Sequence, residues 1–137
     1  MMTKSCPYSI LITDDDRDTR ETLQEIMRGQ GYQTVLASCG EEAIELVRGA
    51  EVHLALLDMH LPTLTGIETL EVVRQHNAIL PCILVTADAS PDVMRQAFQA
   101  RVFSVIPKPV SKNVVVYTVV RALVRVYGAV GNHPSTN

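Results

Sequence analysis

Five short apolar runs, separated by segments with helical spacing, constrain the fold of this 137-residue chain more than any other feature. Each run is four to six residues long and is bounded by polar, glycine or proline residues, as expected of buried strands. The runs cover Tyr8–Thr13, Gln33–Ala37, Leu54–Leu57, Cys82–Thr86 and Phe103–Ile106. Strands that alternate with helices predict right-handed crossovers and a parallel sheet covered by helices on both faces.

The segments between the runs carry helix-start signals. A capping residue followed by an acid three positions later occurs at Asp18 with Glu21, Ser38 with Glu41, and Thr65 with Glu68. Ser90 precedes Pro91, and proline is favoured at the first helical position. Ser111 is expected to cap a last helix, because the apolar spacing behind it continues to Val126, which is too far for one strand.

Length and composition predict one globular domain. Apolar residues make up 47% of the chain, which is enough for a core at this size. We expect the domain to cover residues 8–127, with an N-terminal extension at 1–7. The polar residues 128–137 are expected to form a tail or the start of a linker.

Charge and cysteine content exclude several classes of function. The net charge is −3 and no basic run occurs, which argues against direct nucleic-acid binding. No apolar stretch is long enough to span a bilayer, so no membrane contact is expected. The three cysteines are widely scattered, which predicts neither disulfides nor a metal knuckle and favours a cytoplasmic location.

Polar residues follow four of the five predicted strands. Ligands of an open parallel sheet bind at the carboxyl ends of its strands, so these residues are expected to meet at one edge. They are Asp14, Asp15 and Asp16 after the first strand, Asp58 after the third, Thr86 at the end of the fourth, and Lys108 after the fifth.

Their residue types predict phosphoryl chemistry. Clustered carboxylates stay ionised cheaply only around a cation, and oxygen ligands suit Mg²⁺, with Mn²⁺ as an alternative. Asp58 could form an acyl phosphate, and the Lys108 ammonium would neutralise charge on the phosphoryl oxygens. The Thr86 hydroxyl would donate to the phosphoryl group once it is attached.

Four segments resemble the receiver domains of two-component response regulators, over roughly Ser9 to Tyr127. They are ILITDD at 10–15, LALLDMHLP at 54–62 with Gly66 beyond it, VTA at 85–87, and KP at 108–109. The resemblance implies an α/β, flavodoxin-like (CheY-like) fold with three αβα layers. Its five-stranded parallel sheet would have the order 2-1-3-4-5.

The resemblance also implies a metal site. Asp14 and Asp15 look like the acidic pair at the Mg²⁺ ion, and Asp58 looks like the phosphorylated aspartate. The backbone carbonyl of His60 looks like a further metal ligand.

Thr86 and Lys108 look like the switch hydroxyl and the lysine that contacts the phosphate, and the Lys108–Pro109 bond would be cis. The phosphoryl donor would be a sensor histidine kinase or a phosphotransfer protein. The domain would catalyse its own phosphotransfer and dephosphorylation without being a conventional enzyme. It would signal to an output partner or effector domain, with a phosphorylation-dependent homodimer as one expected form.

Three positions depart from the family pattern. Val105 stands where many receivers carry an aromatic switch residue, and strand alternation places Phe103 on the same face as a substitute. Arg101 occupies the usual glycine after the fourth helix, and Pro107 is an additional proline. These departures predict an altered output surface.

Two other functions compete. A phosphohydrolase of the haloacid dehalogenase type would use Asp14 as nucleophile in an Asp-x-Asp motif with Asp16, although Asp16 is rather expected to be a loop or cap residue. A receiver-like module that only docks to partners would not be phosphorylated. His60 and Asp88 are expected near the site, where they could tune the phosphate lifetime, whereas His53 is expected on the surface.

Overall fold

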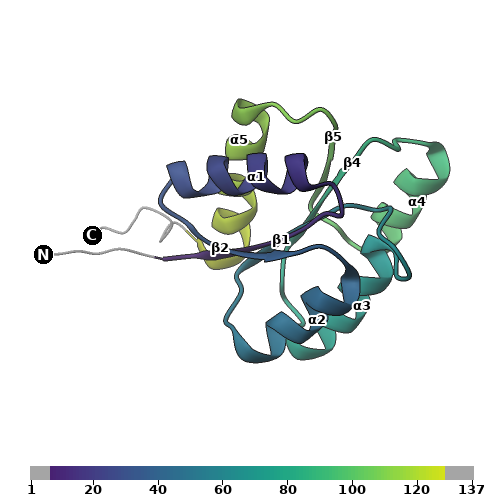
Figure 1. Ribbon diagram of the computed structural model, residues 1–137, viewed down its shortest axis with the longest axis horizontal. Helices are drawn as coiled ribbons and strands as arrows, with labels where there is room; N and C mark the ends of the chain where they lie inside the picture. The colour runs from purple at the N-terminus through teal and green to yellow at the C-terminus, as the bar shows by residue number, and fades with distance from the viewer. Residues whose placement is uncertain (1–6, 129–137) are drawn as a thin grey trace, which may run out of the picture.

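Figure 1 shows the computed structural model, which describes residues 7–128. The five strands are β1 (Ser9–Thr13), β2 (Gln33–Ala37), β3 (Leu54–Leu57), β4 (Cys82–Thr86) and β5 (Ser104–Pro107). The five helices are α1 (Arg17–Gly29), α2 (Gly40–Gly49), α3 (Gly66–His76), α4 (Pro91–Gln99) and α5 (Lys112–Tyr127). Strands and helices alternate as the sequence predicts.

All strand pairs are parallel, and the order across the sheet is β2-β1-β3-β4-β5. This confirms the predicted topology. Three strands have the predicted bounds, whereas β1 begins one residue later and β5 is shifted by one residue toward the C-terminus.

The core consists of two layers, one on each face of the sheet. Alternation along β1 sends Ile10 and Ile12 toward α1 and α5, while Leu11 packs toward α2, α3 and α4. Figure 1 shows α1 and α5 together on one face and the other three helices on the opposite face. The three strands β1, β3 and β4 are buried throughout, as expected for parallel strands covered on both sides.

Helix starts agree with the sequence in part. Thr65 forms the predicted capping box with Glu68, and Ser90 caps α4 with proline behind it. Ser111 occupies the N-cap position of α5, without a side-chain bond to the helix.

Two predicted caps are wrong. Asp16, not Asp18, caps α1, because its carboxylate accepts hydrogen bonds from both the backbone and the hydroxyl of Thr19. Cys39, not Ser38, precedes α2, and Ser38 instead bonds the Glu42 carboxylate.

A ring cluster closes the amino edge of the sheet. The Ser9 N–H donates to His53 Nδ1 at 3.0 Å, and the Tyr127 hydroxyl donates to the His53 carbonyl at 2.8 Å. The rings of Tyr8, His53 and Tyr127 lie with centroids 5.2 to 5.6 Å apart. This cluster ties the end of α5 to the starts of β1 and β3.

Two predictions concern the ends of the chain and membrane-spanning segments. The extension at 1–7 and the tail at 128–137 lie outside the described residues, apart from Pro7 and Gly128, so those boundaries stay predictions. Among the described helices, none has the length and apolar character needed to cross a membrane.

Candidate functional site

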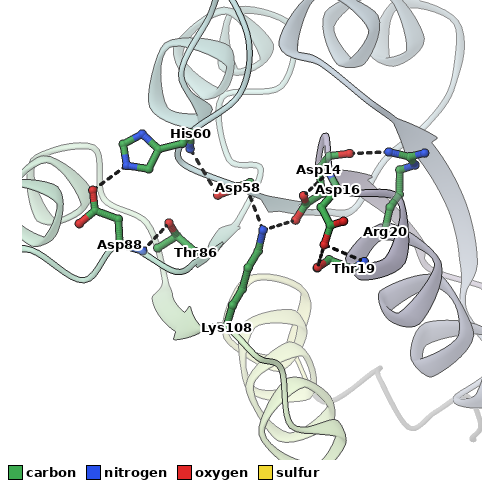
Figure 2. Close-up of polar contacts among 9 residues, drawn as sticks. All are labelled: Asp14, Asp16, Thr19, Arg20, Asp58, His60, Thr86, Asp88 and Lys108. Carbon is green, nitrogen blue, oxygen red and sulfur yellow. Dashed lines mark hydrogen bonds and ion pairs between the residues drawn. The ribbon is translucent and has the colours of Figure 1, made fainter.

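The predicted site residues meet at the carboxyl edge of the sheet (Figure 2). Backbone hydrogen bonds that extend the strand ladders hold them there. The Asp14 N–H donates to the Ala37 carbonyl at 3.1 Å, and the Asp58 N–H donates to the Thr13 carbonyl at 3.0 Å. These bonds fix the backbone that carries the two aspartates to the neighbouring strands.

Lys108 lies at the centre of the site. Its Nζ atom is 3.0 Å from Asp14 Oδ2 and 3.0 Å from Asp58 Oδ2, so one ammonium bridges two carboxylates. Burial by itself would lower the pKa of Lys108, but its close contacts with the charged carboxylates of Asp14 and Asp58 outweigh burial and raise that pKa. The lysine is therefore a fixed positive charge at neutral pH.

Asp14 is a buried carboxylate with one incompletely satisfied oxygen. Its Oδ1 atom accepts the Asp16 N–H at 2.9 Å, and its backbone carbonyl accepts Arg20 Nη1 at 2.7 Å. Oδ2 has only the ion pair with Lys108, which lacks the direction of a hydrogen bond. Burial, with a smaller contribution from the Asp58 charge, raises the pKa of Asp14 despite the Asp16 and Lys108 contacts.

Three carboxylates gather where a cation could bind. One oxygen each from Asp14, Asp15 and Asp58 lies within 4.8 Å of the others, and Asp15 is exposed while the other two are buried. Hard oxygen donors that leave one side open to water match the preference of Mg²⁺, which usually keeps several waters. The unsatisfied Oδ2 of Asp14 is a further reason to regard the donor set as fitting a divalent cation.

His60 lies beside Asp58 through its backbone. Its N–H donates to Asp58 Oδ1 at 3.3 Å, which brings the main chain of this loop to the carboxylates. The predicted role of the His60 carbonyl as a metal ligand stays a prediction.

The His60 side chain points away from Asp58 and toward Asp88 (Figure 2). Nε2 lies 2.6 Å from Asp88 Oδ2, and this contact lowers the pKa of Asp88 to about 2, helped by hydrogen bonds from Ser90. Sequence reasoning placed both residues near the site but did not identify their contact. The pair connects the loop after β3 with the loop after β4.

Thr86 lies at the end of β4 and is buried, next to the lysine-bearing loop. Its hydroxyl accepts the Asp88 N–H at 3.1 Å, and its carbonyl accepts the Lys108 N–H at 3.0 Å. The hydroxyl proton is not used in these contacts and can be donated to another group. The peptide bond from Lys108 to Pro109 is cis, as the family resemblance implies.

Gly66, the first residue of α3, packs against the loop that carries Asp58. Its N–H donates to the Met59 carbonyl at 2.8 Å, and an added Cβ would overlap the Asp58 carbonyl oxygen. A side chain at this position would displace the Asp58 backbone. The glycine is therefore needed for close approach of helix and loop.

The expectation that Phe103 shares a face with Val105 is wrong. Phe103 packs against the α1 and α5 side of the core, whereas Val105 packs against the other side. The physical reason is that β5 begins only at Ser104, so strand alternation does not extend to Phe103. Phe103 instead lies 5.9 Å below the Arg121 guanidinium.

Comparison with known families gives a match to the response regulator receiver domain over residues 10–120. The transcriptional regulatory protein ZraR of Klebsiella oxytoca is 33% identical over 114 residues, which is 83% of this chain and 26% of that protein. A response regulator receiver protein of Anaeromyxobacter is 34% identical over 101 residues, covering 74% of this chain and 42% of that protein. The chain thus spans less than half the length of these relatives.

Solved structures show the same fold. A CheY-like receiver domain protein from Methanospirillum hungatei superposes with a TM-score of 0.83 and 27% identity, covering 88% of this chain and 96% of the other. The chemotaxis response regulator CheY4 of Vibrio cholerae gives a TM-score of 0.78 at 23% identity, covering 85% and 98%. The sheet order and helix placement described above are therefore those of the CheY-like flavodoxin fold.

Proposed function

The chain belongs to the response-regulator receiver family of two-component systems, and from that premise we propose that Asp58 accepts a phosphoryl group in a Mg²⁺-dependent reaction. The donor is the phosphohistidine of a sensor histidine kinase or of a phosphotransfer protein in the cytoplasm. Asp14, Asp15, Asp58 and the His60 carbonyl hold the ion, while Thr86 and Lys108 contact the transferred group.

One observation carries this proposal: Lys108 Nζ lies 3.0 Å from a carboxylate oxygen of both Asp14 and Asp58. A half-buried ammonium between two carboxylates puts positive charge where the negative charge of a phosphoryl group would arrive. Asp58 follows β3, which lies between β1, the strand before the other aspartates, and β4, the strand that ends at Thr86. It is therefore the best placed to become the acceptor.

The reaction forms one bond and breaks another. A carboxylate oxygen of Asp58 attacks the phosphorus atom, and the bond from phosphorus to the donor histidine nitrogen breaks, leaving the electron pair on that nitrogen. Lys108 exchanges its contact with the Asp58 oxygen for contact with a phosphoryl oxygen. A bound divalent cation would supply charge neutralisation at the phosphoryl oxygens.

Thr86 supports a switch in the same site. Its hydroxyl proton is available, because in the described structure the hydroxyl oxygen acts as an acceptor for Asp88. Donation to a phosphoryl oxygen would pull the start of the loop after β4 toward Asp58. The contact exists only in the phosphorylated state, so it can report phosphorylation to an output partner or effector domain.

The phosphorylation step is tested with radiolabelled acetyl phosphate and Mg²⁺. We expect wild-type protein to take up label that is stable in acid and labile in base, and Asp58→Asn to take up none. Asp16→Asn is the matched control, because Asp16 caps α1 and should leave labelling intact. Labelling that persists in Asp58→Asn would contradict the proposal.

The metal requirement is tested separately. The chain contains no tryptophan, so amide NMR shifts rather than tryptophan fluorescence should be followed. We expect Mg²⁺ to shift the amides around Asp14 and Asp58, and beryllofluoride to add a saturable change only when Mg²⁺ is present. A protein that works by docking alone would show neither change.

The contact between His60 and Asp88 supports a role in the lifetime of the phosphoryl group. The two side chains bridge the loops after β3 and β4 and are partly exposed, and we propose that this bridge limits the access of a hydrolytic water to Asp58. We expect His60→Ala to shorten the half-life of the label by removing this bridge. An unchanged half-life would show that the pair has no role in hydrolysis. It would not contradict the proposed phosphorylation of Asp58.

The phosphohydrolase alternative has weaker support. Its Asp-x-Asp motif requires Asp16 beside Asp14 at the reaction centre, whereas the Asp16 carboxylate bonds Thr19 at the start of α1. Sustained turnover of a generic phosphomonoester would favour this alternative.

A phosphorylation-dependent homodimer is a further prediction, tested by sedimentation of labelled and unlabelled protein.

A further inference from the structure

A cavity of about 300 Å³ opens at the amino edge of the sheet, the edge opposite to Lys108. It lies between the C-terminal ends of α2 and α3, the segments that lead into β3 and β4, and Tyr127 at the end of α5. We call this cavity the amino-edge pocket. Its volume is at the lower end of the range of about 300–1,000 Å³ that is typical of small-molecule sites, so it suits a ligand with a single ring.

The floor of the amino-edge pocket is apolar and belongs to the core. Val52, Val73 and Leu80 line it, and each is a buried member of the core layer on the side of α2 and α3. Because close-packed neighbours hold these side chains, the floor is formed before a ligand arrives. The apolar body of a ligand would leave water there without rearrangement of the protein.

One carboxylate sets the charge of the pocket. Among the described side chains that line it, Glu51 is the only acid, and no lysine or arginine is present. The Glu51 side chain is 85% exposed, and its one ion-pair contact within residues 7–128 is with His53 Nε2 at 3.7 Å, too long for a hydrogen bond. The carboxylate therefore keeps its hydrogen-bonding capacity for a ligand.

The negative charge of Glu51 also acts on the wall of the pocket. Burial raises the pKa of the Tyr127 hydroxyl, and interactions with Tyr8 and Glu51 raise it further. An electrostatic field that opposes an anion at Tyr127 favours a cation at the same place. The pocket thus prefers one sign of charge in its ligand.

His53 disfavours a metal ion as this cation. Its Nδ1 atom accepts the Ser9 N–H at 3.0 Å, so Nδ1 carries no proton and the neutral ring keeps its proton on Nε2. Nε2 is the ring atom that contacts Glu51, and a protonated nitrogen has no lone pair for a metal. Coordination would cost the Ser9 hydrogen bond, whereas an organic cation requires no such loss.

Aromatic rings form a further part of the wall. Tyr127 and His53 both line the pocket, with ring centroids 5.6 Å apart and ring planes at 78°. Aromatic rings attract organic cations as well as other rings. This attraction adds to the charge of Glu51 and to apolar burial on the floor.

We propose that the amino-edge pocket binds a small organic amine with an aromatic or branched aliphatic body. The ammonium pairs with Glu51, and the body packs between Tyr127 and the floor of Val52, Val73 and Leu80. The proposal rests on the shape of the pocket and on the single charged side chain in its lining. It goes beyond the proposed function, because the pocket lies at the opposite edge of the sheet from the phosphorylation site.

Binding should also stabilise the fold. Tyr127 and His53 tie the end of α5 to the starts of β1 and β3, and both contribute to the pocket. A ligand that binds only the folded protein raises its melting temperature in proportion to ligand concentration and affinity. Binding therefore has a second readout besides direct titration.

Two other occupants fit less well. A carboxylate ligand would be repelled by Glu51 and would find no lysine or arginine among the described lining residues. A divalent transition metal would require a change at His53, as described above. Both are outcomes of the test.

The full chain is titrated with phenethylamine at neutral pH and followed by amide NMR. Phenethyl alcohol and hydrocinnamate are the matched probes, because they carry the same ring with no charge and with a negative charge. We expect the amine to shift amides that line the pocket in a saturable way, with a dissociation constant on the order of 1 mM. The alcohol should bind about fivefold more weakly, as expected for a partly exposed ion pair, and added salt should reduce the difference.

Two pocket variants locate the binding. Glu51→Gln should weaken the amine about fivefold and leave the alcohol unchanged. Ala50→Phe adds a ring at an exposed position in the lining and should weaken both probes on the order of tenfold or more, with a thermal melt to check the fold. Glu25→Gln is the control, because Glu25 is an exposed glutamate on α1 that does not line the pocket.

Several results would overturn the amine proposal. They are lack of saturation at about 10 mM amine, equal affinities for amine and alcohol, and unchanged amine affinity in folded Glu51→Gln. Tighter binding of hydrocinnamate would assign the pocket to an anion, and displacement of the amine by Zn²⁺ would assign it to a metal. Asp58→Asn should bind the amine normally, so failure here is distinct from failure of the proposed phosphorylation.

Discussion

The two edges of the sheet differ in whether neutral or charged groups hold them together. At the amino edge, Ser9, His53 and Tyr127 are linked by neutral hydrogen bonds and stacked rings. At the carboxyl edge, Asp14 and Asp58 are buried carboxylates that share a single ammonium. Neutral groups that satisfy one another add stability, whereas buried like charges reduce it unless a counter-charge arrives.

The amino edge therefore mainly stabilises the fold, whereas the carboxyl edge is arranged to bind a charged ligand. At the amino edge, any lost contact should lower stability without affecting chemistry. At the carboxyl edge, some substitutions that remove the chemistry should raise stability, because an incomplete charge balance is relieved. The following predictions test that distinction, from the largest expected effect to the smallest.

Lys108→Ala should have the largest effect at the carboxyl edge. Removal of the ammonium leaves Asp14 and Asp58 buried without their shared partner, which we expect to cost about 3 kcal/mol of unfolding free energy. Urea unfolding in the presence of a chelator measures this. Lys112→Ala, an exposed lysine at the start of α5, is the control and should change little. A loss no larger than the control would mean that the carboxylates do not depend on the lysine.

Gly66→Ala should rank second. The new Cβ would overlap the Asp58 carbonyl, and displacement of that loop should cost about 2 kcal/mol and weaken Mg²⁺ binding. Gly49→Ala is matched to it, because nothing lies within 4 Å of a Cβ at that position. Thermal melts with and without Mg²⁺ compare the two variants. Equal melting temperatures would show that the loop accommodates a side chain.

Tyr127→Phe tests the amino edge. It removes one hydrogen bond, from the hydroxyl to the His53 carbonyl, and leaves that carbonyl partly unsatisfied, at an expected cost of about 1 kcal/mol. Labelling of Asp58 and the Mg²⁺ response should be unchanged. Tyr117→Phe, at an exposed tyrosine, serves as the control. A change in labelling would contradict the separation of the two edges.

Asp58→Asn should raise stability by up to about 1 kcal/mol at neutral pH in chelator, while it abolishes labelling. Burial raises the pKa of Asp14 and the Asp58 charge adds to this, so ionised Asp14 opposes folding less once Asp58 is neutral. A carboxyl group whose pKa is raised in the folded state opposes folding at pH values above its unfolded-state pKa, and this opposition is complete above its folded-state pKa. The gain should therefore disappear as the pH falls and Asp14 takes up a proton. A stability loss at neutral pH would overturn this account.

Much of the carboxyl edge could be predicted from sequence, because it depends on strand ends. Asp58, Thr86 and Lys108 were placed together from the rule that parallel strands end at one edge, and the structure brings them together. That prediction needs the strand bounds, which follow from local apolar patterns, and a parallel sheet, which follows from the alternation of strands and helices. An error of one residue at the edge of a strand does not matter there.

The same small error mattered for Phe103. Its face depends on whether β5 begins at Phe103 or Ser104, and alternation reverses the result with a shift of one residue. The cap of α1 failed because Asp18 with Glu21 matches the pattern of a cap followed by an acid, whereas Asp16, which is followed three positions later by Thr19, does not match it and yet caps the helix.

The amino edge could not be predicted at all. His53 was expected on the surface, yet its ring packs between Tyr8 and Tyr127. Its two hydrogen bonds join residues 44 and 74 positions apart, and no local pattern encodes such contacts.

The anchor at Tyr127 turns α5 into a lever. With 16 residues and a rise of 1.5 Å per residue, the helix is about 24 Å long, and its C-terminal end is tied to the starts of β1 and β3. A shift of roughly 1 Å near Lys112 would then become a rotation of about 2° around that fixed end. Tyr117 would move farther than Arg121, and Arg125 would barely move. Any rearrangement around Lys108 would thus reach the exposed side of α5 as a displacement that decreases from the start of the helix to its end.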